Sequence, residues 1–219
     1  MINNSNIEHV LSKLGEEYKN YIKPIVTRIS NKKKNPYRIL IGTVISLRTK
    51  DEVTEEASQR LFKKADNPHD MLNLSQKKIE ELIYPAGFYH KKAKNILQIS
   101  RILLDDYKGK VPKKLSELLK LPGVGRKTAN LVVILGYDKY GICVDTHVHR
   151  ISNRWGYVET KTPEETEKAL RNKLPQKFWK IYNDYLVSFG QNTCKPISPF
   201  CSKCPIAKLC PQISVKKHR

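Results

Sequence analysis

Apolar residues recur at helical spacing along almost the whole chain. In residues 93–104 the apolar side chains repeat every three or four positions, and residues 131–135 continue the same pattern. This spacing places apolar side chains along one face of an α-helix, and the alternation typical of a half-buried strand is not found. The pattern therefore predicts an all-α fold.

Short stretches rich in polar residues, proline and glycine divide this pattern into about ten helices of ordinary length. Three of the predicted helices begin at residues whose side chains can accept a hydrogen bond from the first turn, namely Ser75, Asp145 and Thr162. Pro163 follows Thr162 at the position where proline is favoured in a helix. These residues are predicted N-caps.

The stretch "KLPGVGRKTAN", residues 120–130, predicts a tight hairpin between two helices. Gly123 and Gly125 permit backbone angles or close approaches that a side chain would block. Exposed N–H groups at such a turn form a concavity for a phosphate oxygen, so the hairpin would hold a nucleic-acid backbone without reading its sequence. An ordinary interhelical turn is the alternative interpretation.

Lys127 is predicted to lie in the first turn of the helix that follows this hairpin. At that position the positive end of the helix dipole and the neighbouring Arg126 both disfavour an ammonium group. An amine that loses its proton more easily is a better nucleophile, as imine chemistry on a sugar carbon requires. Lys127 is therefore a candidate nucleophile, and a solvent-facing lysine without a role in catalysis is the alternative.

The charge of the chain predicts a polyanionic partner. Lysine and arginine total 41 against 21 aspartate and glutamate residues, which gives a formal net charge of +20 spread over nearly the whole length. Such a field attracts nucleic acid, although a solvated basic surface would have the same composition. No apolar run approaches the roughly 20 residues of a membrane span, and the first residues do not form a signal peptide. We expect a soluble, intracellular protein.

Four of the five cysteines lie within residues 194–210, in the spacing C-x6-C-x2-C-x5-C. Four thiolates on one short loop indicate a single metal centre. Structural zinc commonly uses two C-x2-C pairs, of which only one occurs here, whereas iron–sulfur clusters take less regular spacings. An iron–sulfur cluster is favoured over zinc, and disulfides are a remote alternative. The ligands would be Cys194, Cys201, Cys204 and Cys210.

The fifth cysteine, Cys143, lies in the apolar stretch "GICV", outside this set, and is predicted to be a buried core thiol.

The motif "LPGVGRKTAN", the later "VDTHVHRISNR" and the cysteine spacing together resemble the helix-hairpin-helix DNA glycosylases of the endonuclease III type. The resemblance extends from about Ile25 to the last cysteine. It implies a helical barrel domain at residues 29–139 that contains the hairpin, and a second helical domain built from residues 1–28 and 140–219. It also implies a [4Fe-4S] cluster on the loop 194–210, and DNA lying across a cleft between the domains.

The same resemblance assigns roles to individual residues. Lysine at the position of Lys127 marks the bifunctional members, which remove a base and then nick the strand, and Asp145 becomes the catalytic carboxylate in addition to a helix cap. A base within a duplex must be flipped out before it can react, and the gap it leaves must be filled. The residues at the matching positions are Arg48 and Phe88, although Phe88 taken alone could equally be a core aromatic residue.

Together with the residues above, this resemblance implies a bifunctional DNA glycosylase and apurinic/apyrimidinic lyase that acts on oxidised pyrimidines in duplex DNA as a cytoplasmic, nucleoid-associated monomer. A mismatch uracil or thymine glycosylase is one alternative, and a non-catalytic DNA-binding protein is another. The predicted DNA-binding residues are Arg48, Phe88, Gly123, Gly125, Arg126, Lys195 and Lys203.

Overall fold

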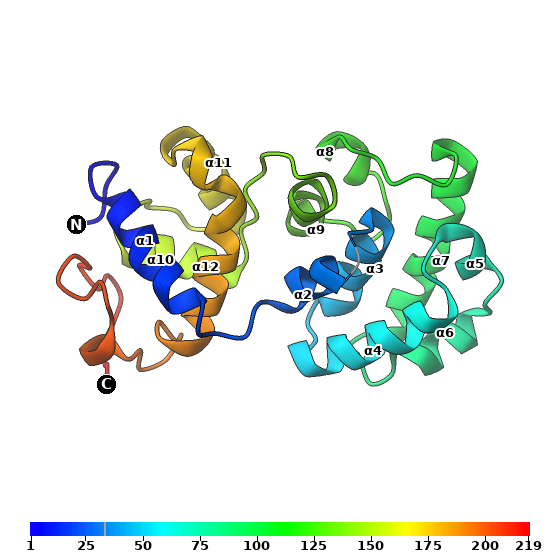
Figure 1. Ribbon diagram of the computed structural model, residues 1–219, viewed down its shortest axis with the longest axis horizontal. Coiled ribbons are helices and arrows are strands. Elements are labelled where there is room, and N and C mark those ends of the chain that lie inside the picture. The colour runs from blue at the N-terminus through cyan, green and yellow to red at the C-terminus, as the bar shows by residue number, and fades with distance from the viewer. Residues whose placement is uncertain (33) are drawn as a thin grey trace. The chain divides into compact units, whose positions relative to one another are not determined.

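The computed structural model describes residues 1–32 and 34–219. Within these ranges the secondary structure is entirely helical, with twelve α-helices and three short π- or 3-10 turns (Figure 1). The predicted all-α class is confirmed. No helix in the described part of the chain is both long enough and apolar enough to cross a lipid bilayer.

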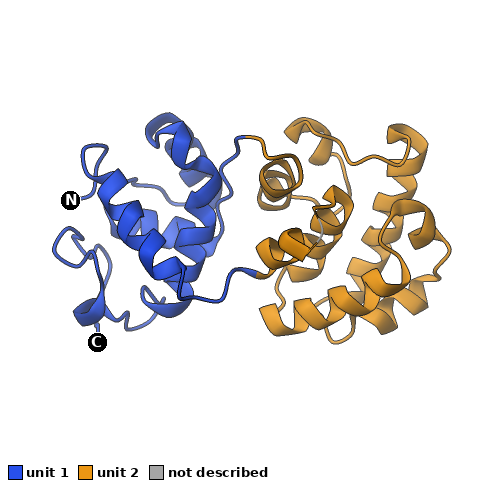
Figure 2. Cartoon of the chain, viewed as in Figure 1, with its two compact units in different colours: residues 1–24, 140–219 blue, residues 25–139 orange. Residues whose placement is uncertain are grey.

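The chain divides into two compact units, which Figure 2 shows in different colours. One unit consists of residues 25–139, and the other combines residues 1–24 with residues 140–219. The boundary expected between residues 28 and 29 falls inside a helix, α2 (Ile25–Lys32), which lies wholly in the first of these units.

The unit of residues 25–139 is built around one buried helix, α3. This helix is apolar around most of its circumference, and every residue from Ile39 to Ile45 is buried. A helix with this composition must be covered on all sides, and α3 packs against α2, α4, α7, α9 and the π-helical turn η1. The helices of this unit after α2 are α3 (Pro36–Ser46), α4 (Asp51–Lys64), α5 (Pro68–Leu72), α6 (Gln76–Ile83), α7 (Tyr89–Tyr107), α8 (Leu115–Leu118) and α9 (Arg126–Leu131), followed by η1 (Val132–Gly136).

The longest helix, α7, buries a stripe of side chains against α3, α5 and α6. Ala93, Ile96 and Leu103 lie on this stripe, as the sequence pattern predicts. Leu97 and Leu104 are only half-buried. Each follows a buried residue by about 100° of helical rotation, which brings it to the edge of the stripe.

The second unit has its own core, to which both ends of the chain contribute. The N-terminal helix packs against α12, and α12 also contacts α10. Large aromatic side chains fill the centre, with Trp155, Tyr182 and Phe189 almost fully buried. The elements of this unit are α1 (Ile7–Tyr18), α10 (Thr146–Arg154), α11 (Pro163–Lys173), η2 (Gln176–Phe178), α12 (Trp179–Asn192) and η3 (Cys201–Lys203).

Candidate functional site

The hairpin that the sequence predicts joins α8 to α9. Its two glycines occupy their positions for different structural reasons. Gly123 has φ +74°, and a Cβ atom added there would lie 2.3 Å from the amide nitrogen of Asn95 on α7. Gly125 has an ordinary φ of −93°, and an added Cβ would meet no atom within 4 Å. The fold therefore requires glycine at position 123. At Gly125 the glycine instead leaves open space over an exposed stretch of backbone.

Lys127 is the second residue of α9, directly after Arg126, as the sequence predicts. The three residues that follow it, Thr128, Ala129 and Asn130, are buried and fix the helix in the unit. The amide of Asn130 also donates to the backbone carbonyl of Arg126 at 3.0 Å. These contacts hold the first turn of α9 in place. Lys127 itself, the candidate nucleophile, is half-buried.

Asp145 caps the N-terminus of α10, which confirms its predicted structural role. Its Oδ1 atom accepts hydrogen bonds from the backbone N–H groups of His147 at 2.9 Å and Val148 at 3.0 Å. These two bonds fix the orientation of the carboxylate. Asp145 belongs to the unit of residues 1–24 and 140–219, whereas Lys127 belongs to the unit of residues 25–139.

Arg48 and Phe88 lie close together although forty residues separate them in sequence. Both have left-handed backbone conformations, with φ 51° and 58°, which are uncommon for residues other than glycine. The Arg48 guanidinium lies 5.6 Å from the centre of the Phe88 ring. Phe88 is 63% exposed, so it is not a core aromatic residue. The structure thus brings these two predicted DNA-binding residues together on the surface of one unit.

A buried lysine that the sequence analysis did not single out lies beneath this pair. Lys92 on α7 is 5% exposed, and its Nζ atom donates to the carbonyls of Ile45 and Leu47 and to the hydroxyl of Thr49. Burial lowers the pKa of Lys92 to about 8. Its sequence signal is its register, because Lys92 precedes Ile96 by four positions and so falls on the apolar stripe of α7.

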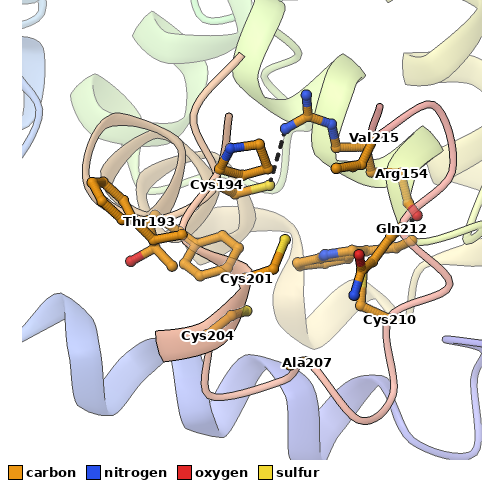
Figure 3. Close-up of a pocket in the computed structure, with 13 residues that line it drawn as sticks. Arg154, Thr193, Cys194, Cys201, Cys204, Ala207, Cys210, Gln212 and Val215 are labelled. Atoms are coloured by element: carbon orange, nitrogen blue, oxygen red, sulfur yellow. Dashed lines mark hydrogen bonds between the residues drawn. The ribbon is translucent and has the colours of Figure 1, made fainter. Parts of the chain in front are cut away.

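The four C-terminal cysteines line one pocket (Figure 3). Burial raises the pKa of the Cys204 thiol to about 12, and the neighbouring sulfurs also raise it. Burial likewise raises the thiol pKa values of Cys201 and Cys210 above the ordinary value. Thiolates in such a place need a positive centre close to them. Cys143 is buried elsewhere, as predicted.

The sulfurs of the four cysteines are a donor set that a metal centre could use, because all four line the same pocket. Four thiolates can hold either a zinc ion or an iron–sulfur cluster. The choice of the cluster rests on the C-x6-C-x2-C-x5-C spacing in the sequence and stays a prediction.

Two arginines of α10 hold the backbone of the cysteine loop. Arg154 donates to the Cys194 sulfur at 3.4 Å, the dashed line in Figure 3, and to the carbonyls of Lys195 and Pro196, both at 2.6 Å. Arg150 donates to the Cys194 carbonyl at 2.9 Å. The sequence analysis missed these contacts, because they join segments about forty residues apart.

The two lysines predicted to face DNA phosphates near this loop differ in exposure. Lys203 is exposed. Lys195 is half-buried, with its ammonium 5.3 Å from the centre of the Phe200 ring. Their DNA-binding role stays a prediction.

Comparison with known proteins places this geometry in a family. The HhH-GPD superfamily of base excision DNA repair proteins matches residues 41–176. Endonuclease III of Thermotoga maritima is 49% identical over 181 residues, which cover 83% of this chain and 85% of that protein. Endonuclease III of Bacillus subtilis is 36% identical over 96% of this chain and 94% of its own length.

Solved structures agree. A non-covalent endonuclease III–DNA complex is 35% identical with a TM-score of 0.86, and a trapped endonuclease III–DNA covalent intermediate is 34% identical with a TM-score of 0.84. Each match covers 97% of this chain and 97% of the chain in the solved structure. The chain therefore belongs to the endonuclease III family, within the HhH-GPD superfamily of base excision DNA repair proteins.

Proposed function

We propose that this member of the family is a DNA glycosylase and apurinic/apyrimidinic lyase that removes oxidised pyrimidines from duplex DNA and then nicks the strand. The observation that carries the proposal is Lys127, a lysine in the first turn of the helix that follows an exposed, glycine-containing hairpin. An amine at this position can attack a sugar carbon, which a serine or tyrosine in its place could not do with the same chemistry.

The reaction begins at the sugar. The Nζ atom of Lys127, once unprotonated, forms a bond to C1′ of the deoxyribose, and the bond from C1′ to the base breaks with its electron pair leaving on the base. A proton passes from the bound amine to the ring oxygen O4′ as the bond between C1′ and O4′ breaks, so the sugar ring opens and a protonated imine joins Nζ to C1′. Loss of a proton from C2′ breaks the bond between C3′ and its phosphate oxygen, and this β-elimination nicks the strand 3′ to the lesion.

Asp145 supplies a fixed negative charge. Its carboxylate is oriented by two backbone N–H groups, so it would stabilise the positive charge that develops on the deoxyribose without first having to reorient. It would also accept the proton that Lys127 must lose before it attacks. Capping α10 and assisting the reaction are compatible roles for one carboxylate.

The remaining predicted residues would hold the DNA. Gly125 leaves the hairpin backbone accessible to a phosphate, and Arg126 adds a positive charge beside it. Lys195 and Lys203 would contact phosphates near the cysteine loop. Arg48 and Phe88 would fill the gap left by the flipped nucleotide, which is consistent with their exposure.

The four cysteines would hold a [4Fe-4S] cluster. When bound, the iron centre would hold the four thiolates and so order the loop 194–210, which the contacts of Arg154 join to α10. No step of the glycosylase reaction requires electron transfer, so its role in this proposal is structural.

Borohydride trapping on duplex DNA with one abasic site tests the proposal, because borohydride reduces the imine to a stable crosslink. Wild-type protein should crosslink, and Lys127→Gln should bind the same DNA without crosslinking. Lys120→Gln is a matched control, since Lys120 is an exposed lysine on the other side of the hairpin.

Three outcomes would contradict parts of the proposal. A persistent crosslink in Lys127→Gln would place the nucleophile elsewhere. No crosslink and no excision by wild type would favour the non-catalytic alternative. Base excision without strand nicking would favour the mismatch glycosylase.

A further inference from the structure

The ammonium of Lys92 joins the two loops that carry Arg48 and Phe88. It donates at 2.6 Å to the carbonyls of Ile45 and Leu47, which lie at the C-terminal end of α3, and at 2.8 Å to the Thr49 hydroxyl. An ammonium has three N–H donors, so these acceptors use all of them. Since Lys92 belongs to α7, these bonds tie the connection between α3 and α4 to the helix that begins directly after Phe88.

The loop before Phe88 is held by the same group of atoms. The backbone N–H of Gly87 donates to the Thr49 hydroxyl at 3.1 Å, the oxygen that also accepts from Lys92. A Cβ atom added to Gly87 would lie 2.5 Å from the backbone oxygen of Arg48. The two loops therefore touch backbone to backbone, and only glycine at position 87 allows this approach.

The conformations of Arg48 and Phe88 need this support. Each is a non-glycine residue in the left-handed region, where strain persists only when the surrounding structure holds it. Neither side chain is held by burial, because both are exposed. Their geometry therefore depends on the backbone contacts made through Thr49, Gly87 and Lys92.

Burying an ammonium group between helices costs free energy, because the charge loses its hydration. Its three acceptors are neutral, and burial alone lowers its pKa. Its bonds to the Ile45 and Leu47 carbonyls satisfy acceptors at the C-terminal end of α3, which is a structural role. Its bond to Thr49 goes further, because it reaches the loop that carries Arg48 and the hydroxyl to which Gly87 also donates.

Building on the proposed function, we propose that Lys92 is a positioning residue for insertion into DNA: its three hydrogen bonds lock residues 47–49 against residues 87–88, so that Arg48 and Phe88 enter the gap as one rigid pair. Lys92 itself touches neither the lesion nor the sugar. Its loss should therefore impair reactions that need the gap to be filled and spare those that do not.

The first experiment follows insertion without chemistry. A duplex carries a tetrahydrofuran abasic analogue, which cannot form an imine, opposite 2-aminopurine, whose fluorescence rises when it is unstacked. Wild-type protein should raise the fluorescence at saturation, whereas Lys92→Met should lose most of the increase. Lys94→Met is the matched control, because Lys94 is an exposed lysine on the same helix and its removal costs the same charge.

The second experiment compares borohydride trapping on duplex and single-stranded DNA with an abasic site. A single strand has no partner strand and so no gap to fill. Lys92→Met should be trapped about tenfold more slowly than wild type on duplex, as expected for a misplaced insertion pair, and at the wild-type rate on single-stranded DNA. Thr49→Val, which removes the hydroxyl shared by Lys92 and Gly87, should show the same selective loss even if Lys92→Met does not fold.

Two results would overturn the inference: a fluorescence increase in Lys92→Met equal to that of Lys94→Met, or an equal loss of trapping on both DNAs, which would indicate a merely structural lysine. Failure of the wild-type protein to be trapped on either DNA is a different result, since it would contradict the proposed function. The fluorescence experiment would still report on Lys92 in that case, because it involves no imine.

Discussion

At the scale of single residues, we predict that Arg48 recognises the base opposite the lesion. The forked donors of a guanidinium match the O6 and N7 acceptors of guanine, whereas a glutamine suits adenine better. A good bidentate pair discriminates by about 1 to 3 kcal/mol, so lesions opposite guanine should be excised roughly tenfold faster than lesions opposite adenine. Arg48→Gln should abolish this preference, as measured by single-turnover excision of 5-hydroxyuracil opposite each base.

The neighbouring Lys50 provides the control for this measurement. It is exposed and basic, and Lys50→Gln should weaken binding equally for both opposing bases. If Arg48→Gln behaves in the same way and also lowers the salt dependence of binding, Arg48 contacts only a phosphate.

Residues whose chemistry is local could be found from the sequence, and residues whose role depends on distant partners could not. Asp145 caps α10 as its residue type and position predict. Lys92 looks like one of three lysines in "HKKAKNI", and only its register on α7 distinguishes it. Its acceptors lie more than forty residues earlier in the chain, so no local pattern could have revealed them.

At the scale of elements, the hairpin offers a test in which two similar substitutions should have opposite consequences. Gly125→Ala adds a methyl group in open space at an ordinary φ, so the melting temperature should change little. The same methyl group would occupy the space that a phosphate needs, and binding to abasic duplex should weaken about tenfold, roughly the loss of one hydrogen bond to a charged group.

Gly123→Ala should instead destabilise the fold. The substitution forces alanine into the left-handed region, which costs about 1 kcal/mol or more, and places a methyl group against Asn95. Thermal melting and binding by fluorescence anisotropy separate the two effects. Unchanged DNA binding by Gly125→Ala would show that no phosphate approaches at that position.

The first residues of the helices could be predicted better from the sequence than the backbone conformation within the helices. Ser75 and Thr162 accept hydrogen bonds from the first turns of α6 and α11, as their residue types predict. The helix expected from residue 126 onward instead changes to a π-helical turn at Val132–Gly136. The spacing of apolar residues does not distinguish an α-helix from a π-helical turn, because leucine, isoleucine and valine suit both. The change of backbone hydrogen-bonding partner depends on no particular residue type, so the sequence does not indicate it.

At the scale of the whole molecule, both ends of the chain contribute to the core of the same unit. Val10, Leu11 and Leu14 of α1 are buried in the same cluster as Trp155 and Phe189. The amphipathic pattern of residues 7–18 shows that this helix must be covered, but not by which segment. Only the resemblance to a known family pairs the two ends, and the boundary that it implies lies inside α2, whereas the compact unit begins with that helix.

The predicted metal centre should affect the two units differently, because each unit has its own core. Cys194, Cys204 and Cys210 pack against the core of the unit that contains both termini. As purified, the protein should be yellow-brown with about four iron atoms per chain. Cys204→Ser should reduce the iron content and speed amide exchange in α10 and α12, since the loop that Arg154 holds loses its order.

In the same variant, amide exchange in α3 and α7 should stay slow, because those helices pack within the separate core of residues 25–139. Iron analysis and hydrogen exchange followed by mass spectrometry make both measurements. Cys143→Ala is the control, since this cysteine is buried outside the pocket and its loss should leave the iron content unchanged. A colourless protein with stoichiometric zinc would rule out the cluster, and equal loss of protection in both units would show that the metal centre stabilises the chain as a whole.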